Sequence, residues 1–327
     1  MLCPPLRSFS LPFLSCLSLL VMLVSLAPAL AADRGLPYPA VGADTVRDQL
    51  LARSALLYDA TTGKVLYERN IDEPFPPAST TKLMTALLVY ELKGMGGSLQ
   101  VEDGDTYVEP SHVPLIPGEV VSIDVLMHSL LIASDNDSAM ALGRYAGGTL
   151  ANFIDLMNQR AVELGCTHTH FVNPNGLPAR GHETTAHDLM LIFQKAISIP
   201  VLREIMQIKT YALDTEHGSQ ILHNHNKLLG KYPGMGPAKT GWTIASRHTY
   251  AAAATRDGHE LQLIILDSPD KWRDAVLLFN YGFANLPPIP APPVMGPAPT
   301  PGAAPAPAPA AAVTAPHPVT TAAATHP

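Results

Sequence analysis

The stretch PPASTTKLMTALLVYEL, residues 76–92, joins a polar beginning to a long apolar run. The apolar residues predict a helix over about residues 80–92, ending near Gly94. Ser79 and Lys82 stand three positions apart where this helix begins. Residues at this spacing share one face of a helix, so the hydroxyl and the amine are predicted to be neighbours.

A serine and a lysine in this arrangement can form a nucleophile and its base. A serine hydroxyl needs a base to take its proton, and a lysine can do so only when its amine is neutral. The apolar run that follows would lower the pKa of Lys82 by burying it. In the structural alternative, Ser79 caps the helix and Lys82 extends to solvent. The pattern alone is weak, because residues 268–271 repeat it in a segment without an apolar setting.

Two further polar segments follow along the chain. Ser134-Asp135-Asn136 interrupts an apolar run, which indicates either a capping turn or a cluster that relays a proton and holds a substrate amide. Lys239-Thr240-Gly241 enters a predicted inner strand, where a cation and a hydroxyl suit a carboxylate. Gly241 would let a ligand approach the backbone closely, and the strand edge could pair with a peptide-like substrate.

The order of the predicted elements indicates an α+β fold over residues 35–285. Residues 54–59 and 64–68 flank a turn at Gly63, and residues 241–255 and 259–266 flank an Asp-Gly turn, so both ends of the region predict hairpins. Helices are predicted between them at residues 122–146, 151–165 and 184–196, and a last one at 272–281, capped by Gly282. Both ends of this region would therefore build one sheet, covered by helices.

The two ends of the chain differ in composition from this region. Residues 1–31 carry one charge, an apolar run and a small-x-small site at Ala29-Leu30-Ala31, which predicts a secretory signal peptide rather than a retained anchor. Export argues against ATP-driven chemistry. Residues 287–327 are rich in proline and alanine and are predicted to be a disordered tail, either a spacer or a tolerated extension.

Composition and spacing argue against several classes of partner. The net charge is −7 and no basic block stands out, so nucleic acid is not an expected partner. Cys166 would be the one cysteine of the exported chain, which excludes an internal disulfide. Cys166, His168 and His170 lack the spacing of a structural zinc site, and neither a metal nor another cofactor is predicted.

The motifs S-x-x-K, S-D-N and K-T-G occur here in the order typical of penicillin-binding proteins and class A β-lactamases. With NPNGL at 173–177, HNHNKLL at 223–229 and LLFNYGF at 277–283, the chain over residues 50–285 resembles the low-molecular-mass penicillin-binding proteins. These are the serine-type D-alanyl-D-alanine carboxypeptidases of the peptidase S11 group. The resemblance implies an antiparallel five-stranded sheet flanked by helices, plus an all-helical subdomain, with the catalytic cleft between them.

The resemblance also implies roles for individual residues. By position, Ser79 would be the acylated nucleophile, Lys82 its base and Ser134 the relay of a proton to the leaving D-alanine. The substrate would be held by the amide of Asn136 and, at its carboxylate, by Lys239 and Thr240 with Arg273 nearby. The backbone N–H groups of Ser79 and of a residue after Gly241, namely Thr243, would form the oxyanion hole.

The sequence departs from the family at two places. Residues 244–248 are bulkier and more basic than the small Ala-Gly pair that the family often has there, and Arg247 is a further candidate for an anion contact. The C-terminal β-domain and amphipathic helix of many members are not recognisable, so membrane anchoring is not expected.

The function implied is removal of D-alanine from peptidoglycan stem peptides in the bacterial periplasm or envelope, with β-lactams as covalent inhibitors. A D,D-endopeptidase that cleaves cross-links uses the same chemistry, and a non-catalytic peptidoglycan-binding protein could use the same fold. Class A β-lactamases carry an E-x-x-x-N segment between the second and third motifs. The sequence lacks it between Asn136 and Lys239, so bound β-lactams are expected to stay attached.

Overall fold

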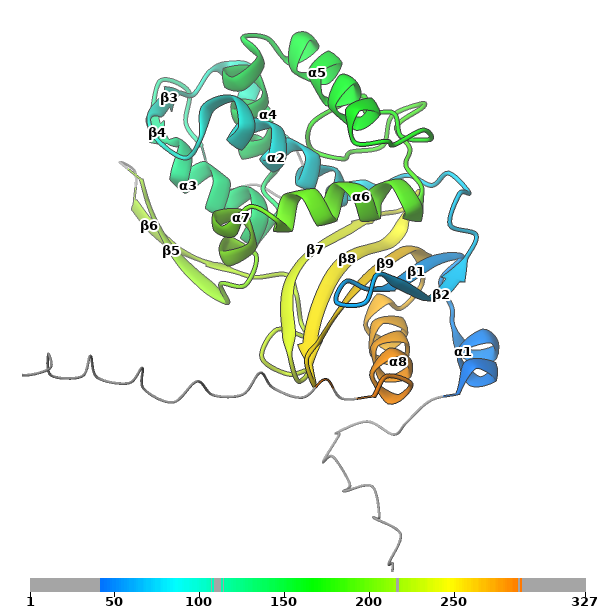
Figure 1. Ribbon diagram of the computed structural model, residues 1–327. Coiled ribbons are helices and arrows are strands. Elements are labelled where there is room, and N and C mark those ends of the chain that lie inside the picture. The colour runs from blue at the N-terminus through cyan, green and yellow to red at the C-terminus, as the bar shows by residue number, and fades with distance from the viewer. Residues whose placement is uncertain are drawn as a thin grey trace, which may run out of the picture.

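The computed structural model describes residues 42–106, 108, 113, 115–215, 218–287 and 289 (Figure 1). The predicted signal peptide lies outside these residues. So does the predicted tail, apart from Pro287 and Ile289. Within the described part of the chain, none of the helices has the length and apolar character needed to cross a membrane.

A five-stranded antiparallel sheet forms the centre of the molecule and has the order β2-β1-β9-β8-β7. Its strands come from both ends of the described chain, which confirms the predicted α+β architecture. They are β1 (Ser54–Asp59), β2 (Lys64–Arg69), β7 (Met235–Thr243), β8 (Arg247–Arg256) and β9 (His259–Ser268). Because β7 lies at the edge, one side of this strand has no neighbouring strand in the sheet.

Both faces of the sheet are buried, and alternate residues of β9 divide between two cores. Ile264 and Leu266 point into the larger core, toward α6 (Ala186–Ile197), whereas Leu263 and Ile265 pack with α8 (Lys271–Ala284). The short helix α1 (Ala43–Gln49) contacts α8 on that same side (Figure 1). Burial on both faces explains why β9 reads as an almost continuous apolar run.

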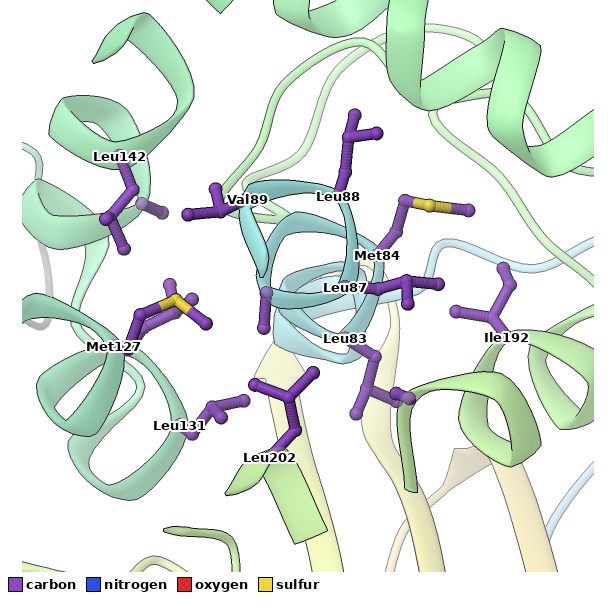
Figure 2. Close-up of a cluster of buried hydrophobic side chains, with 14 of the residues drawn as sticks. Leu83, Met84, Leu87, Leu88, Val89, Met127, Leu131, Leu142, Ile192 and Leu202 are labelled. Carbon is purple, nitrogen blue, oxygen red and sulfur yellow. The ribbon is translucent and has the colours of Figure 1, made fainter. Parts of the chain in front are cut away.

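The second half of the molecule is a helical subdomain built around α2 (Lys82–Lys93). Figure 2 shows α2 in cross-section, with its apolar side chains directed toward neighbouring elements on several sides. Those neighbours include α4, α5 and α6, and the core that they share continues onto the sheet. The remaining elements of the subdomain and its surroundings are α3 (Ile123–His128), α4 (Asn136–Gly147), α5 (Leu150–Glu163), α7 (Pro200–Ile205) and the hairpins β3 (Ser98–Gln100)–β4 (Val120–Ser122) and β5 (Thr210–Thr215)–β6 (Gly218–His223).

Three sequence predictions differ from the observed elements. The helix predicted at 122–146 is broken by a π-helical turn at Ser129–Ala133 and by Ser134. Residues 241–255 form the end of β7 and most of β8, separated by a turn at 244–246. Gly282 lies inside α8 rather than capping it. A glycine is needed there because a Cβ would lie 2.9 Å from Leu57 Cδ2, where the helix packs closely on the sheet.

Candidate active site

The backbone before α2 is strained at the residue that precedes Ser79. Ala78 has a φ of +49°, in the left-handed region that side chains other than glycine rarely adopt. Thr249 Oγ1 on β8 and Thr80 Oγ1 both donate to the carbonyl oxygen of Pro77, at 2.8 and 2.7 Å. These contacts fix the turn between the sheet and α2, and Ser79 lies in this turn.

Lys82 is fully buried at the first turn of α2 and touches three polar groups. Its Nζ lies 3.0 Å from Ser79 Oγ, 2.8 Å from Asn136 Oδ1 and 2.6 Å from the carbonyl oxygen of Asn175. Burial lowers the pKa of Lys82 to about 7, although the nearby Asp135 raises it. A neutral amine has two N–H groups and one lone pair, so it can donate to Asn136 and Asn175 and accept the hydroxyl proton of Ser79.

The S-D-N segment follows the π-helical turn, a feature that often occurs at functional sites. Ser134 adopts a left-handed conformation, with φ 60° and ψ 34°, and α4 begins directly after Asp135. Asp135 caps α4 by accepting from the backbone N–H of Ser138 at 2.7 Å and also accepts from Val113 N–H at 2.5 Å. Asp135 therefore has a structural role between two residues that face the site.

Ser134 and Asn136 connect Lys82 with the strand that carries K-T-G. Lys239 Nζ on β7 donates to Ser134 Oγ at 2.8 Å, and Asn136 Nδ2 donates to Val108 O at 3.3 Å. Lys239 is buried, and this burial, with Lys82 and Lys271 nearby, lowers its pKa well below the usual range. One N–H of the Asn136 amide remains to bind a ligand.

Gly241 brings the edge strand β7 against the turn that holds Ser79. A Cβ at this position would lie 2.8 Å from the backbone nitrogen of Ser79 and 3.0 Å from Ala78 Cβ, so only glycine fits. Thr243 N–H donates to Ser246 Oγ at 3.1 Å inside the β7–β8 turn. Because successive N–H groups of a strand point to opposite edges, Trp242 N–H is directed to the free edge instead.

The interpretation of Thr243 as the second oxyanion donor therefore does not agree with the structure, since Ser246 already occupies its N–H. Trp242 is the better candidate. Trp242 could have been chosen from the sequence, because it directly follows Gly241. The hydrogen bond from Thr243 N–H to Ser246, which excludes Thr243, is visible only in the folded turn.

A cavity of about 470 Å³ opens on one side of Ser79 and is rich in cationic and imidazole groups. Lys227, Lys271, His225 and His248 line it together with Thr240 and Ser134. Desolvation in the cleft and the charges of Lys239 and Lys271 lower the pKa of His225 to about 4, although its side chain keeps contact with solvent. An excess of positive charge beside a nucleophile suits an anionic substrate.

The structure does not bring Arg273 to this cavity. Its side chain is exposed on α8, whereas Lys271, two residues earlier, is buried and lines the cavity. Lys271 Nζ is 2.9 Å from His248 Nδ1, and burial lowers the pKa of Lys271 to about 8. Residues two apart on a helix point in very different directions, so only one of them can face the site. Arg247 is likewise directed elsewhere, to Asp267.

Lys271 was not predicted as a site residue, because the pattern at 268–271 was interpreted as lacking an apolar setting. Ser268 is in fact fully buried and donates to Asp274 at 2.7 Å, and α8 begins with Lys271. His182 was also missed. Its Nδ1 accepts from Val172 N–H at 2.8 Å, so Nε2 carries the proton and donates to Thr81 Oγ1 at 2.9 Å. This contact supports the turn beside Ser79.

The candidate metal ligands have other partners. Cys166 is buried, with Sγ 3.5 Å from Asp188 O, and burial raises the pKa of its thiol to about 12. Across the described residues, no three His, Cys, Asp or Glu side chains are grouped closely enough to hold a metal ion.

Comparison with known proteins identifies the family of this chain. The sequence pattern of the peptidase S11 family, D-alanyl-D-alanine carboxypeptidase, matches residues 41–270. The D-alanyl-D-alanine carboxypeptidase DacB2 of Mycobacterium tuberculosis is 34% identical over 244 residues, 72% of this chain and 84% of the relative. A D-alanyl-D-alanine endopeptidase of Pseudomonas aeruginosa is 31% identical over 262 residues, 78% of this chain and 83% of the relative.

The fold is also similar to solved structures. The crystal structure of a D-alanyl-D-alanine carboxypeptidase from Mycobacterium tuberculosis superposes with a TM-score of 0.69 at 32% identity, covering 78% of this chain and 96% of that one. The chain therefore belongs to the peptidase S11 family of D-alanyl-D-alanine carboxypeptidases, which are serine hydrolases.

Proposed function

We propose that the protein removes the terminal D-alanine from peptidoglycan stem peptides through an acyl-enzyme on Ser79. The observation that carries this proposal is the contact of 3.0 Å between Ser79 Oγ and the buried amine of Lys82. With a pKa of about 7, Lys82 is neutral in a large fraction of molecules near neutral pH, and it can then take the hydroxyl proton.

In the first step, Ser79 Oγ bonds to the carbonyl carbon of the peptide bond while its proton passes to Lys82. The negative charge on the carbonyl oxygen is stabilised by the backbone N–H groups of Ser79 and Trp242. The carbon–nitrogen bond then breaks, and the proton that Lys82 accepted passes through Ser134 to the leaving amine, which makes Lys82 neutral again. Ser134 Oγ lies 2.8 Å from Lys239 Nζ. Water hydrolyses the ester and restores the free Ser79 hydroxyl.

The cationic cavity is proposed to hold the carboxylate of the terminal D-alanine. Thr240 and Lys271 line this cavity, and Lys271 would take the role expected of Arg273. Lys239 is buried directly before Thr240 on β7. The amide of Asn136 would bind the acyl side through its remaining N–H. No cofactor is needed for these steps.

Cleavage of D,D cross-links is the second candidate function, because the endopeptidase relative from Pseudomonas aeruginosa matches most of this chain. Purified protein incubated with a pentapeptide monomer is expected to release D-alanine, and Ser79→Ala is expected to release none. Cleavage of a cross-linked dimer without cleavage of the monomer would replace the carboxypeptidase with an endopeptidase.

Two other readings make different predictions for a labelled penicillin. A non-catalytic binding protein would not be labelled covalently, and a β-lactamase would release the label within seconds. We expect a stable adduct that survives denaturation. An exported enzyme of the bacterial envelope would meet both the stem peptides and these antibiotics.

A further inference from the structure

Two cavities of opposite character meet at Ser79. The cationic one, described above, would receive the carboxylate end of the substrate, which leaves as D-alanine. The second has a volume of about 240 Å³ and is lined by Ser79, Asn136 and Thr243 together with four apolar side chains and Gly176. Because the leaving group would occupy the cationic side, the acyl part of the substrate extends into this second cavity.

The apolar side chains of the second cavity come from two separate segments. Leu177 and Pro178 lie on one wall, whereas Trp242 lies near the end of β7 and Ile244 lies in the turn that follows. Trp242 is 56% exposed and Ile244 is 89% exposed, so two large apolar side chains lie at the surface beside Ser79. Their exposure beside a nucleophile indicates a binding surface rather than part of the core.

The charges around this cavity differ sharply from those of its neighbour. The described residues that line it are apolar, small, hydroxyl-bearing or amide-bearing, and none of these carries a charge. An ammonium group entering it would lose water without gaining a carboxylate partner among these residues, which is costly. An amide or alkyl group would instead gain contact with Ile244 and Trp242.

We propose that this apolar cavity binds the residue that precedes the D-alanine pair and selects substrates in which its side-chain amine is blocked as an amide over those with a free ammonium. Such a blocked amine occurs in a stem peptide joined to a neighbour through that side chain. The proposal rests on the proposed function and adds to it a substrate class. Ile244 is the main specificity-determining residue, because it is the most exposed apolar side chain of the lining.

Two tripeptides test this proposal. Nα,Nε-diacetyl-L-Lys-D-Ala-D-Ala and Nα-acetyl-L-Lys-D-Ala-D-Ala share the same scissile bond. They differ only in the acetyl group on the lysine side chain, which turns its ammonium into a neutral amide. We expect kcat/KM of the full chain to be about 10-fold higher for the diacetyl peptide. Equal values, or a preference for the free ammonium, would overturn the proposal.

Variants of a residue that lines the apolar cavity test the proposal further. Ile244→Glu places a carboxylate beside the lysine side chain, so the ratio of the two kcat/KM values is expected to fall to about 1 or to reverse. Ile244→Leu is expected to keep the wild-type ratio, and so is Val162→Glu, a matched change at a 74% exposed residue of α5. An unchanged ratio in Ile244→Glu would also overturn the proposal.

The failure of this inference is distinguishable from the failure of the proposed function. If penicillin labels Ser79 and both peptides are hydrolysed equally well, only the assignment of the apolar cavity is wrong. If penicillin does not label Ser79 and neither peptide is hydrolysed, the proposed function fails and the inference fails with it.

Discussion

At the scale of single residues, the site depends on lysines that are buried among apolar side chains. In the proposed mechanism, Lys82 must be neutral to act as a base, whereas Lys271 must be charged to hold a carboxylate. Burial lowers the pKa of both, to about 7 for Lys82 and about 8 for Lys271. The two requirements overlap only in a narrow range of pH.

The pH dependence of kcat/KM is therefore expected to be bell-shaped, with its maximum between about 7 and about 8. Below this range Lys82 binds a proton and cannot accept one from Ser79. Above it Lys271 loses its proton and its attraction for the substrate carboxylate. In Lys271→Arg the alkaline limb should move to higher pH, because arginine stays charged. If that limb stays in place when the rates are measured from pH 5 to 10, Lys271 does not hold the carboxylate.

Lys82 also makes the stability of the folded protein depend on pH. The folded-state pKa of Lys82, about 7, lies below the usual value of 10.5. The unfolded chain therefore binds more protons between these values, and wild-type stability falls as pH drops from 9 to 6. Lys82→Met removes this effect. Its free energy of unfolding, relative to wild type, should rise by about 2–3 kcal/mol between pH 9 and pH 6.

Urea unfolding of Lys82→Met at the two pH values provides the measurement. The exposed Lys64→Met serves as the control and should show little change relative to wild type. A difference between Lys82→Met and wild type that is independent of pH would show that burial does not perturb Lys82.

Contacts between site residues could be predicted from the sequence where a motif fixes the spacing along one element. Ser79 and Lys82 share one turn, and their contact follows from helical geometry. Arg273 and Thr243 were misplaced because their orientation depends on a helix face and on a turn hydrogen bond. Neither is visible before the elements pack together.

At the scale of elements, the site is formed where β7 meets the turn before α2. Gly241 is the contact point, and Gly176 similarly allows the chain near Ala78 to pass close to the loop that follows Asn175. The turn between β7 and β8 was missed, whereas helix α2 and the β8–β9 hairpin were predicted from apolar periodicity and turn residues. The π-helical turn was not, since its sequence continues the apolar pattern of α3.

Gly241→Ala tests this junction. The added Cβ would press on the Ser79 backbone nitrogen, displace the nucleophile and lower the rate of acylation by about 100-fold. Gly96→Ala is the matched control, because a Cβ at Gly96 meets no atom within 4 Å. Stopped-flow measurement of penicillin acylation would compare the two. Equal rates would indicate that β7 does not set the position of Ser79.

At the scale of the whole molecule, the sheet unites both ends of the described chain. His259 Nε2 donates to Pro287 O at 2.9 Å, and Ile289 N–H donates to Asp257 O at 2.9 Å. The segment after α8 is thus attached to the β8–β9 turn. The end of the ordered domain was predicted at residue 285, because proline-rich composition gives no sign of these two hydrogen bonds.

Two truncations test this attachment. A chain that ends at Asn285 loses both contacts, and its Tm is expected to fall by about 2–4 °C. A chain that ends at Ile289 should keep the Tm and the kcat/KM of the full chain for a soluble peptide. If the two truncated proteins melt at the same temperature, Pro287 and Ile289 do not stabilise the fold.

The central claim, that Ser79 is the nucleophile, is tested most directly by the intact mass of the protein after incubation with benzylpenicillin. The mass of the wild-type protein should increase by that of one penicillin molecule, and peptide mapping should place the adduct on Ser79. Ser79→Ala should show no increase while keeping its Tm within a few degrees. An adduct on another residue, or equal labelling of wild type and Ser79→Ala, would contradict the account.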